Sequence, residues 1–192
     1  MALKIDICNK ALTLIKNKYR VNNFDTDTGI IADLLRTYYP DAVRASLADF
    51  SYSFATTTIT PALAVGVTIP PPFTFAFRLP GDYLHPADNW CMPKWTVGAD
   101  NISSIMFTST GGFEFSYVRD ISEQPFLFPI YFRMGVEYFL ASFLAPDLEG
   151  VKSRNSKETI QMYINMAERY LRKARVMDTR LRGSRRHEDQ WL

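Results

Sequence analysis

The fold is decided by one stretch, Pro125-Phe-Leu-Phe-Pro129-Ile-Tyr-Phe-Arg-Met-Gly-Val-Glu-Tyr-Phe-Leu-Ala-Ser-Phe-Leu-Ala-Pro146. Pro129 suits the first turn of a helix, where its missing N–H is not needed, and Pro146 is expected to end that helix. The helix predicted over about 129–145 is apolar on nearly every side, and such helices are buried on several sides. We therefore expect a central helix with other helices around it. One face of this helix is predicted to carry Phe132, Val136, Phe139 and Phe143.

Three other segments carry apolar residues at helical spacing, over about 3–18, 29–50 and 157–181. Asp25, Asp27 or Thr28 could cap the second of them, with Gly29 in its first turn. Pro40 lies inside this segment and is expected to kink the helix or split it. Together with the central helix, these segments predict an antiparallel helical bundle.

The residues between the second and the central helix, about 55–120, have a different pattern. Short β-branched or alternating aromatic runs occur at 56–60, 74–79, 95–97, 102–107 and 113–118. Thr108-Ser-Thr-Gly-Gly112 reads as the hairpin loop between the last two runs. We expect a small antiparallel β-sheet inserted into one domain over 1–182. The predicted fold class is α+β and mainly α, with an extended C-terminal tail over 183–192.

Composition and charge say little about partners, except at the end of the chain. The 192 residues carry a net charge of +2. Residues 172–192 hold seven basic and three acidic side chains, a net charge of +4 that leaves −2 for the rest. Cys8 and Cys91 are far apart and are expected to be free thiols in a reducing compartment. No secretory signal peptide or membrane-spanning segment is expected.

Enzyme chemistry finds little support in the sequence. His85 and His187 have no ligand partner at helical spacing, so we expect neither a metal site nor a cofactor. No phosphate-binding or nucleophile motif occurs. Glu137 on the central helix could act as a desolvated general acid. Arg133 lies four residues earlier, however, and a structural Arg133–Glu137 ion pair is the favoured interpretation. No catalytic residue is predicted.

The basic tail is open to three interpretations: it could neutralise nucleic-acid phosphates, dock on a protein partner, or be a solvated end. Docking is favoured because two large apolar residues end the charged segment, and Trp and Arg are enriched where binding energy concentrates. The predicted docking residues are Arg180, Arg182, Arg185, Arg186, Trp191 and Leu192.

Four segments, in order along most of the chain, resemble the head-to-tail adaptor proteins of short-tailed phages, the tail accessory or tail tubular family. They are Asp6-Ile-Cys-Asn-Lys-Ala-Leu12, Asp27-Thr-Gly-Ile-Ile-Ala-Asp-Leu-Leu-Arg-Thr-Tyr-Tyr-Pro-Asp-Ala-Val-Arg44, Leu79-Pro-Gly-Asp-Tyr-Leu84 and the helix from Pro129 that ends Leu140-Ala-Ser-Phe-Leu-Ala145. The resemblance implies a structural protein of the virion tail neck, assembled in the host cytoplasm, and no enzyme.

The resemblance also implies partners. Family members form a ring, of twelve copies, below the portal protein; their C-terminal tail docks on the portal, and the tail nozzle or tubular protein binds the lower face. The lumen conducts double-stranded DNA during packaging, retention and genome ejection. Two alternatives remain open: a tail-associated peptidoglycan hydrolase, which would need a pair of carboxylates, and a nucleic-acid-binding protein acting through the basic tail.

Overall fold

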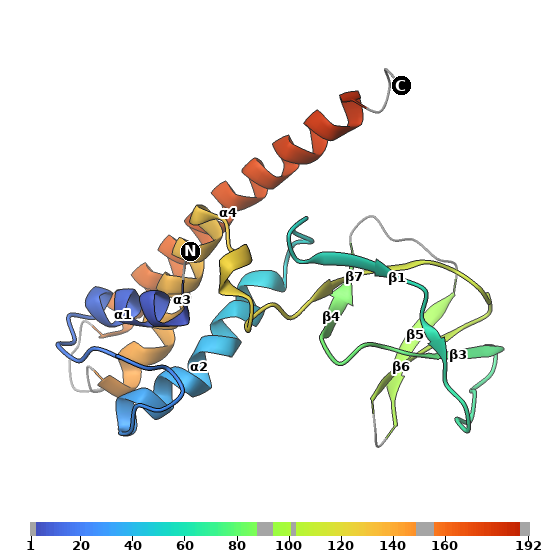
Figure 1. Ribbon diagram of the computed structural model, residues 1–192, viewed down its shortest axis with the longest axis horizontal. Coiled ribbons are helices and arrows are strands. Elements are labelled where there is room, and N and C mark those ends of the chain that lie inside the picture. Colours follow the sequence, from blue (N-terminus) through green and yellow to red (C-terminus); the bar gives the residue numbers. More distant parts are fainter. Residues whose placement is uncertain (1–2, 88–93, 101–102, 149–155, 189–192) are drawn as a thin grey trace. The chain divides into compact units, whose positions relative to one another are not determined.

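The computed structural model describes residues 3–87, 94–100, 103–148 and 156–188 (Figure 1). The chain is α+β and divides into two compact units. The first contains Met1–Asp49 and Ile121–Leu192, and the second contains Phe50–Asp120. The insertion predicted over about 55–120 lies within this second compact unit.

The described part of the first unit contains four α-helices and a short 3-10 helix. They are α1 (Lys4–Leu14), α2 (Ile30–Leu47), η1 (Pro125–Leu127), α3 (Ile130–Leu148) and α4 (Ser156–Glu188). Helix α3 packs against α1, α2 and α4, which confirms the predicted central helix. Packing against three neighbouring helices explains its almost uniformly apolar sequence.

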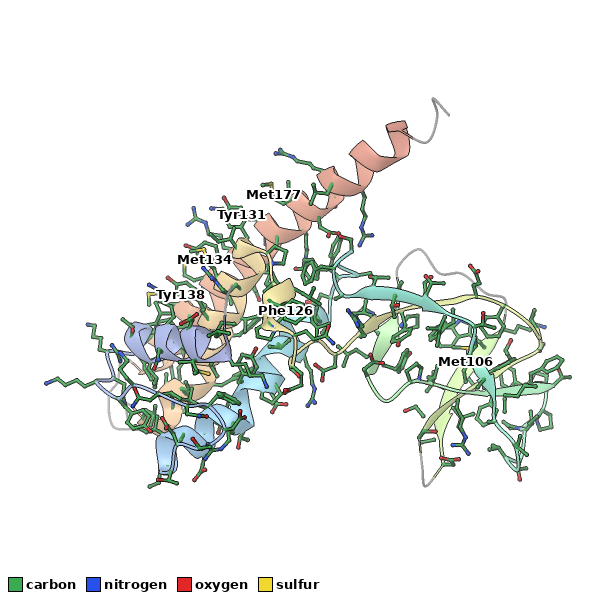
Figure 2. The ribbon with its side chains drawn as sticks, in the orientation of Figure 1. Met106, Phe126, Tyr131, Met134, Tyr138 and Met177 are labelled. Carbon is green, nitrogen blue, oxygen red and sulfur yellow. The ribbon has the colours of Figure 1, made fainter. Side chains whose placement is uncertain are left out.

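The four residues predicted to share one face of α3 are not equally buried. Phe132, Val136 and Leu140 are fully buried, but Phe139 and Phe143 are only half-buried. Small residues complete the buried surface instead, and a Cβ added at Gly135 would lie 2.6 Å from Leu171 Cδ2 on α4. The missing side chain therefore allows α3 and α4 to approach closely. Figure 2 shows the larger side chains of Tyr131, Met134 and Tyr138 along the same helix.

The two internal prolines end neither helix. Helix α2 continues through Pro40 as one helix, with Tyr39, Ala42 and Val43 buried around the proline. Helix α3 continues through Pro146 to Leu148, where the prediction ended it at 145. The hydroxyl of Tyr38 donates a hydrogen bond of 2.8 Å to the Asp147 carboxylate and ties this last turn to α2. Packing on the same core outweighs the single hydrogen bond that each proline removes.

Helix α1 ends at Leu14, earlier than the predicted residue 18, and its C-terminal cap contains no glycine. The N–H of Lys16 donates to the Thr13 carbonyl (3.0 Å) and the N–H of Asn17 donates to the Leu12 carbonyl (2.9 Å). Lys16 adopts the left-handed conformation, with φ 57°, that this Schellman motif requires. Because a lysine takes the position usually held by glycine, no stop signal is visible in the sequence.

The start of α2 also differs from the prediction. Gly29, with φ 118°, is the N-cap residue, and no side chain caps the helix. Of the proposed caps, Asp27 instead accepts a hydrogen bond of 2.8 Å from the N–H of Asn22 and closes the preceding loop.

Helix α4 is longer than predicted. It continues through Gly183 and Ser184 to Glu188, whereas the sequence placed its end at 181 and an extended tail over 183–192. The backbone of 183–188 is therefore helical, and residues 189–192 lie outside the described residues. One glycine in a helix costs only about 1 kcal/mol, and strong helix formers precede it here.

The second unit contains two antiparallel sheets rather than the single predicted one. One has the order β1 (Thr56–Ile59), β7 (Phe115–Arg119), β4 (Tyr83–Pro86), and the other has the order β2 (Ala62–Leu63), β3 (Phe75–Arg78), β6 (Ser104–Thr108), β5 (Trp95–Ala99). The predicted hairpin between the last two strands is wrong: β6 pairs with β3 and β5, and β7 pairs with β1 and β4.

The residues that follow β6 carry the chain from one sheet to the other, with Gly112 at φ 66°. Phe115 and Tyr117 on β7 do share a face, as predicted, and their rings stack 5.5 Å apart. They pack with Leu79 and with Met106 of β6 in one buried cluster. The alternating pattern of the two runs therefore reflects side-chain packing between β6 and β7. It does not reflect hydrogen bonds between the two strands.

A candidate docking surface on the last helix

Helix α4 has one buried seam. Tyr163, Ala167, Leu171, Ala174 and Asp178 lie on it, three or four residues apart. The hydroxyl of Tyr163 donates a hydrogen bond of 2.8 Å to the carbonyl of Leu14, at the end of α1. Asp178, a buried carboxylate, forms an ion pair of 2.9 Å with Arg182 Nε. This seam fixes which side of α4 is turned away from the core.

A second stripe on α4 is exposed and combines cations with apolar side chains. Its members follow the spacing i, i+3, i+4, i+7, i+8, i+11, i+12, which places them on one side of a helix. We call this stripe the apolar-basic face; it contains Arg169, Arg172, Lys173, Val176, Met177, Arg180 and Leu181. Val176 and Met177 are each 48% exposed and Leu181 is 64% exposed. Large apolar side chains exposed in a contiguous row mark interaction surfaces.

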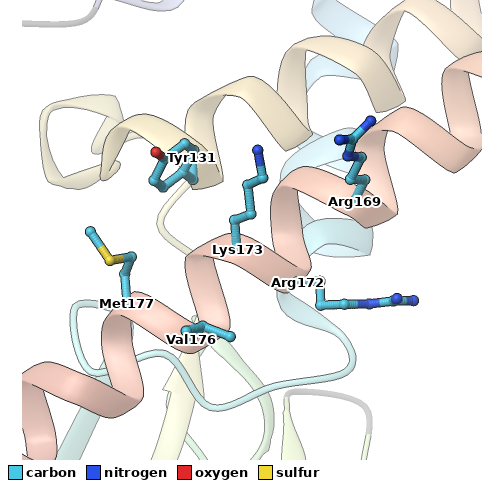
Figure 3. A pocket seen from close by; sticks show the side chains of 6 residues that line it. All are labelled: Tyr131, Arg169, Arg172, Lys173, Val176 and Met177. Carbon is cyan, nitrogen blue, oxygen red and sulfur yellow. The ribbon is translucent and has the colours of Figure 1, made fainter.

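The first half of this face forms one wall of a hollow of about 390 Å³ between α3 and α4. Tyr131 of α3 lines it together with five residues of the apolar-basic face (Figure 3). The Lys173 ammonium lies 5.7 Å from the centroid of the Tyr131 ring and 5.5 Å from that of Tyr170. These cation–π contacts hold the lysine stem over aromatic surface and leave the charge at the mouth of the hollow.

The electrostatic character of the hollow is positive. Arg169, Arg172 and Lys173 line it, and no acidic residue is among its lining residues. Within the described part of the chain, Arg169, Arg172 and Arg180 make no ion pair. Neighbouring arginines behave differently, because Arg175 pairs with Asp49 at 3.7 Å and Arg182 pairs with Asp178.

The predicted docking residues are only partly brought together. Arg180 lies on the apolar-basic face, but Arg182 pairs with Asp178. Arg185 and Arg186 belong to the helical backbone, with side chains that are not described, and Trp191 and Leu192 lie outside the described residues. The predictions missed the five face residues from 169 to 177. Their spacing of three and four residues is the signal in the sequence that could have identified them.

Arg133 and Glu137 form the ion pair expected from their spacing. Arg133 Nε lies 3.5 Å from Glu137 Oε1, and the glutamate is buried. Burial raises the pKa of Glu137, while the charges of Arg133 and Lys10 oppose that rise. The Glu137 carboxylate is therefore paired with Arg133 and largely removed from water on the central helix.

No group of three or more His, Cys, Asp or Glu side chains is arranged to hold a metal ion within the described ranges. None of the described helices combines the length and the apolar character that crossing a membrane requires. Comparison of the sequence with models of known protein families and with curated proteins found no match.

Proposed function

We propose that this chain is a structural protein of a phage virion, a head-to-tail adaptor that joins the portal to the tail. The observation that carries the proposal is the apolar-basic face, which lies on a helix of 33 residues, longer than the 19-residue α3 on which it packs. Figure 1 shows α4 continuing beyond the other helices of its unit. A helix that keeps exposed apolar and basic side chains where it leaves its own core is suited to docking on another protein.

The resemblance in four collinear segments supplies the rest of the proposal. The adaptor would assemble as a ring of copies, of twelve by analogy with the family, in the neck of the virion. The portal would bind the C-terminal end of α4 and the residues beyond it, and the tail nozzle protein would bind the opposite side of the ring. Double-stranded DNA would pass through the lumen. No enzymatic step belongs to this function.

The test is co-sedimentation with purified portal rings of the same virus. The full chain is compared with a chain truncated after Thr179, which removes Arg180, Arg182, Arg185, Arg186, Trp191 and Leu192. Saturable binding that truncation abolishes supports an adaptor with a C-terminal docking element. Binding that survives truncation supports an adaptor that docks through its helical body. If neither chain binds, the adaptor proposal fails, and digestion of purified cell walls would test the hydrolase alternative.

A further inference from the structure

We propose that the apolar-basic face, together with Tyr131, binds an acidic amphipathic helix of a partner protein. The inference rests on the proposed function only for the identity of that partner, which would be the portal. The proposed site lies on the helical body. Most of the site precedes Thr179, the residue after which the chain is truncated in the portal-binding test. The residues that carry it are the six that line the hollow and the continuing pair Arg180 and Leu181.

The charge of the site selects an acidic partner. Three cations line the hollow without an acid among the lining residues, and Arg180 adds a fourth one turn beyond Val176 and Met177. Complementary charges across an interface fix orientation and exclude wrong partners. Arg is also the cation best suited to pair with a carboxylate, because its fork can donate two parallel hydrogen bonds.

The apolar centre of the site selects a protein over a nucleic acid. Val176 and Met177 lie between the cations at 169–173 and Arg180, with Tyr131 facing them across the hollow. A phosphate backbone offers nothing to cover exposed Val and Met, whereas a partner with apolar side chains removes them from water. Methionine adapts its shape to such a partner, and Tyr and Arg are typical of the residues that carry binding energy.

The linear arrangement selects a helical segment. The apolar-basic face follows one helix from Arg169 to Leu181, which is roughly 18 Å at 1.5 Å per residue. A partner helix of about three turns would match this length. It would place apolar side chains over Val176 and Met177, and carboxylates toward Arg169 and Lys173 at one end and toward Arg180 at the other.

The first probe is a fluorescein-labelled synthetic peptide of about three helical turns, built from glutamate and leucine with one tryptophan. Its control replaces each glutamate by lysine. Fluorescence anisotropy with the full chain should show saturable binding of the acidic peptide at low salt, weakening as salt is added, and no saturable binding of the basic peptide. Absence of saturable binding by the acidic peptide would overturn the inference.

Charge reversal locates the binding. The variant Arg169→Glu with Lys173→Glu should bind the acidic peptide at least about tenfold more weakly, because two attractions become repulsions. The matched control is Lys18→Glu with Lys157→Glu, which changes the net charge equally at exposed positions off the face and should keep the wild-type affinity. All four lysine and arginine side chains are exposed, so both variants should fold, as cooperative unfolding would verify. If both variants lose the same affinity for the acidic peptide, binding depends on the net charge of the chain and not on this face, and the inference is wrong.

A third variant separates a protein from DNA. Val176→Ser with Met177→Ser keeps every charge and should weaken binding of the acidic peptide several-fold. A short DNA duplex should bind this variant as it binds the wild-type chain. If the duplex competes with the peptide and the serine variant leaves peptide affinity unchanged, the face is an electrostatic surface for nucleic acid, and the inference is wrong.

Portal rings then distinguish the inference from the proposed function. Peptide binding that depends on the face, without any portal binding, would keep the docking site and refute the portal as its partner. Portal binding by the wild-type chain that the charge reversal leaves unchanged would keep the adaptor and refute this site. Loss of portal binding in the charge-reversed chain, with the matched control unaffected, would support both.

Discussion

Gly135 offers a decisive test of the packing between α3 and α4. In Gly135→Ala the new Cβ would lie 2.6 Å from Cδ2 and 2.8 Å from Cγ of Leu171, which is itself 3% exposed. Overpacking of this kind typically costs about 1–3 kcal/mol. Alanine also stabilises a helix relative to glycine, by about 1 kcal/mol. We therefore expect the free energy of unfolding to fall by between about 0 and 2 kcal/mol.

A double-mutant cycle makes the prediction sharp. Leu171→Ala should lower the free energy of unfolding by about 2–5 kcal/mol, because it opens a cavity against α3. In that background Gly135→Ala no longer meets the leucine, so the same substitution should stabilise the protein by about 1 kcal/mol or more. The effect of the alanine changes sign, and the coupling free energy should be about 1–3 kcal/mol.

The assay is urea unfolding of the four chains, followed by circular dichroism and fitted with a common slope. Leu181→Ala provides the matched control, because it removes the same atoms from a side chain that is 64% exposed. Its cycle with Gly135→Ala should be additive within about 0.5 kcal/mol. If the Leu171 cycle is equally additive, α3 and α4 do not approach at Gly135, and the reasoning from the missing Cβ is refuted.

Three other predictions concern buried groups. Because burial raises the pKa of Glu137, its contribution to stability is present at low pH and is lost as the pH rises through the raised pKa; wild-type stability should therefore fall relative to Glu137→Gln as the pH rises above about 4.5, and parallel urea midpoints would contradict this. Met106→Ala should lower the free energy of unfolding by about 2–5 kcal/mol, since the side chain is fully buried, and a loss below about 1 kcal/mol would place it outside the core. Burial raises the pKa of Cys8 to about 12, so in a Cys91→Ser background a thiol reagent at pH 8 should label the chain only in urea, and labelling of the folded chain at the rate of a free thiol would refute its burial.

Much of the first unit is predictable because its sequence periodicity is strong. The apolar stretch from Pro129 identified α3 as the central helix, and the i, i+4 spacing identified the Arg133–Glu137 pair. Helix ends were less predictable. Lys16 caps α1 in a conformation usually given to glycine, and Pro146 lies inside the last turn of α3. At Pro146 the local preference is outweighed by packing and by a contact from a residue distant in the sequence, the hydrogen bond of Tyr38 to Asp147.

The candidate site, too, was predictable only in part from the sequence. The basic character of the C-terminal end was visible in the sequence, but the residues that act together were not. Arg182, a predicted docking residue, pairs with a buried aspartate, whereas Arg169 and Lys173, which were not predicted, line a hollow with Tyr131. A list of basic residues cannot separate exposed cations from paired ones, because that depends on which side of α4 packs on α3.

The α+β class, the central helix and the position of the β insertion could be predicted from the sequence, because each depends on composition or periodicity within one segment. Tertiary structure alone decided that β6 and β7 belong to different sheets, and that one side of α4 is exposed with apolar and basic side chains together. Both outcomes depend on contacts between segments far apart in the chain. Alternation along a strand shows which face is buried, but it does not show which strand is the hydrogen-bonding neighbour.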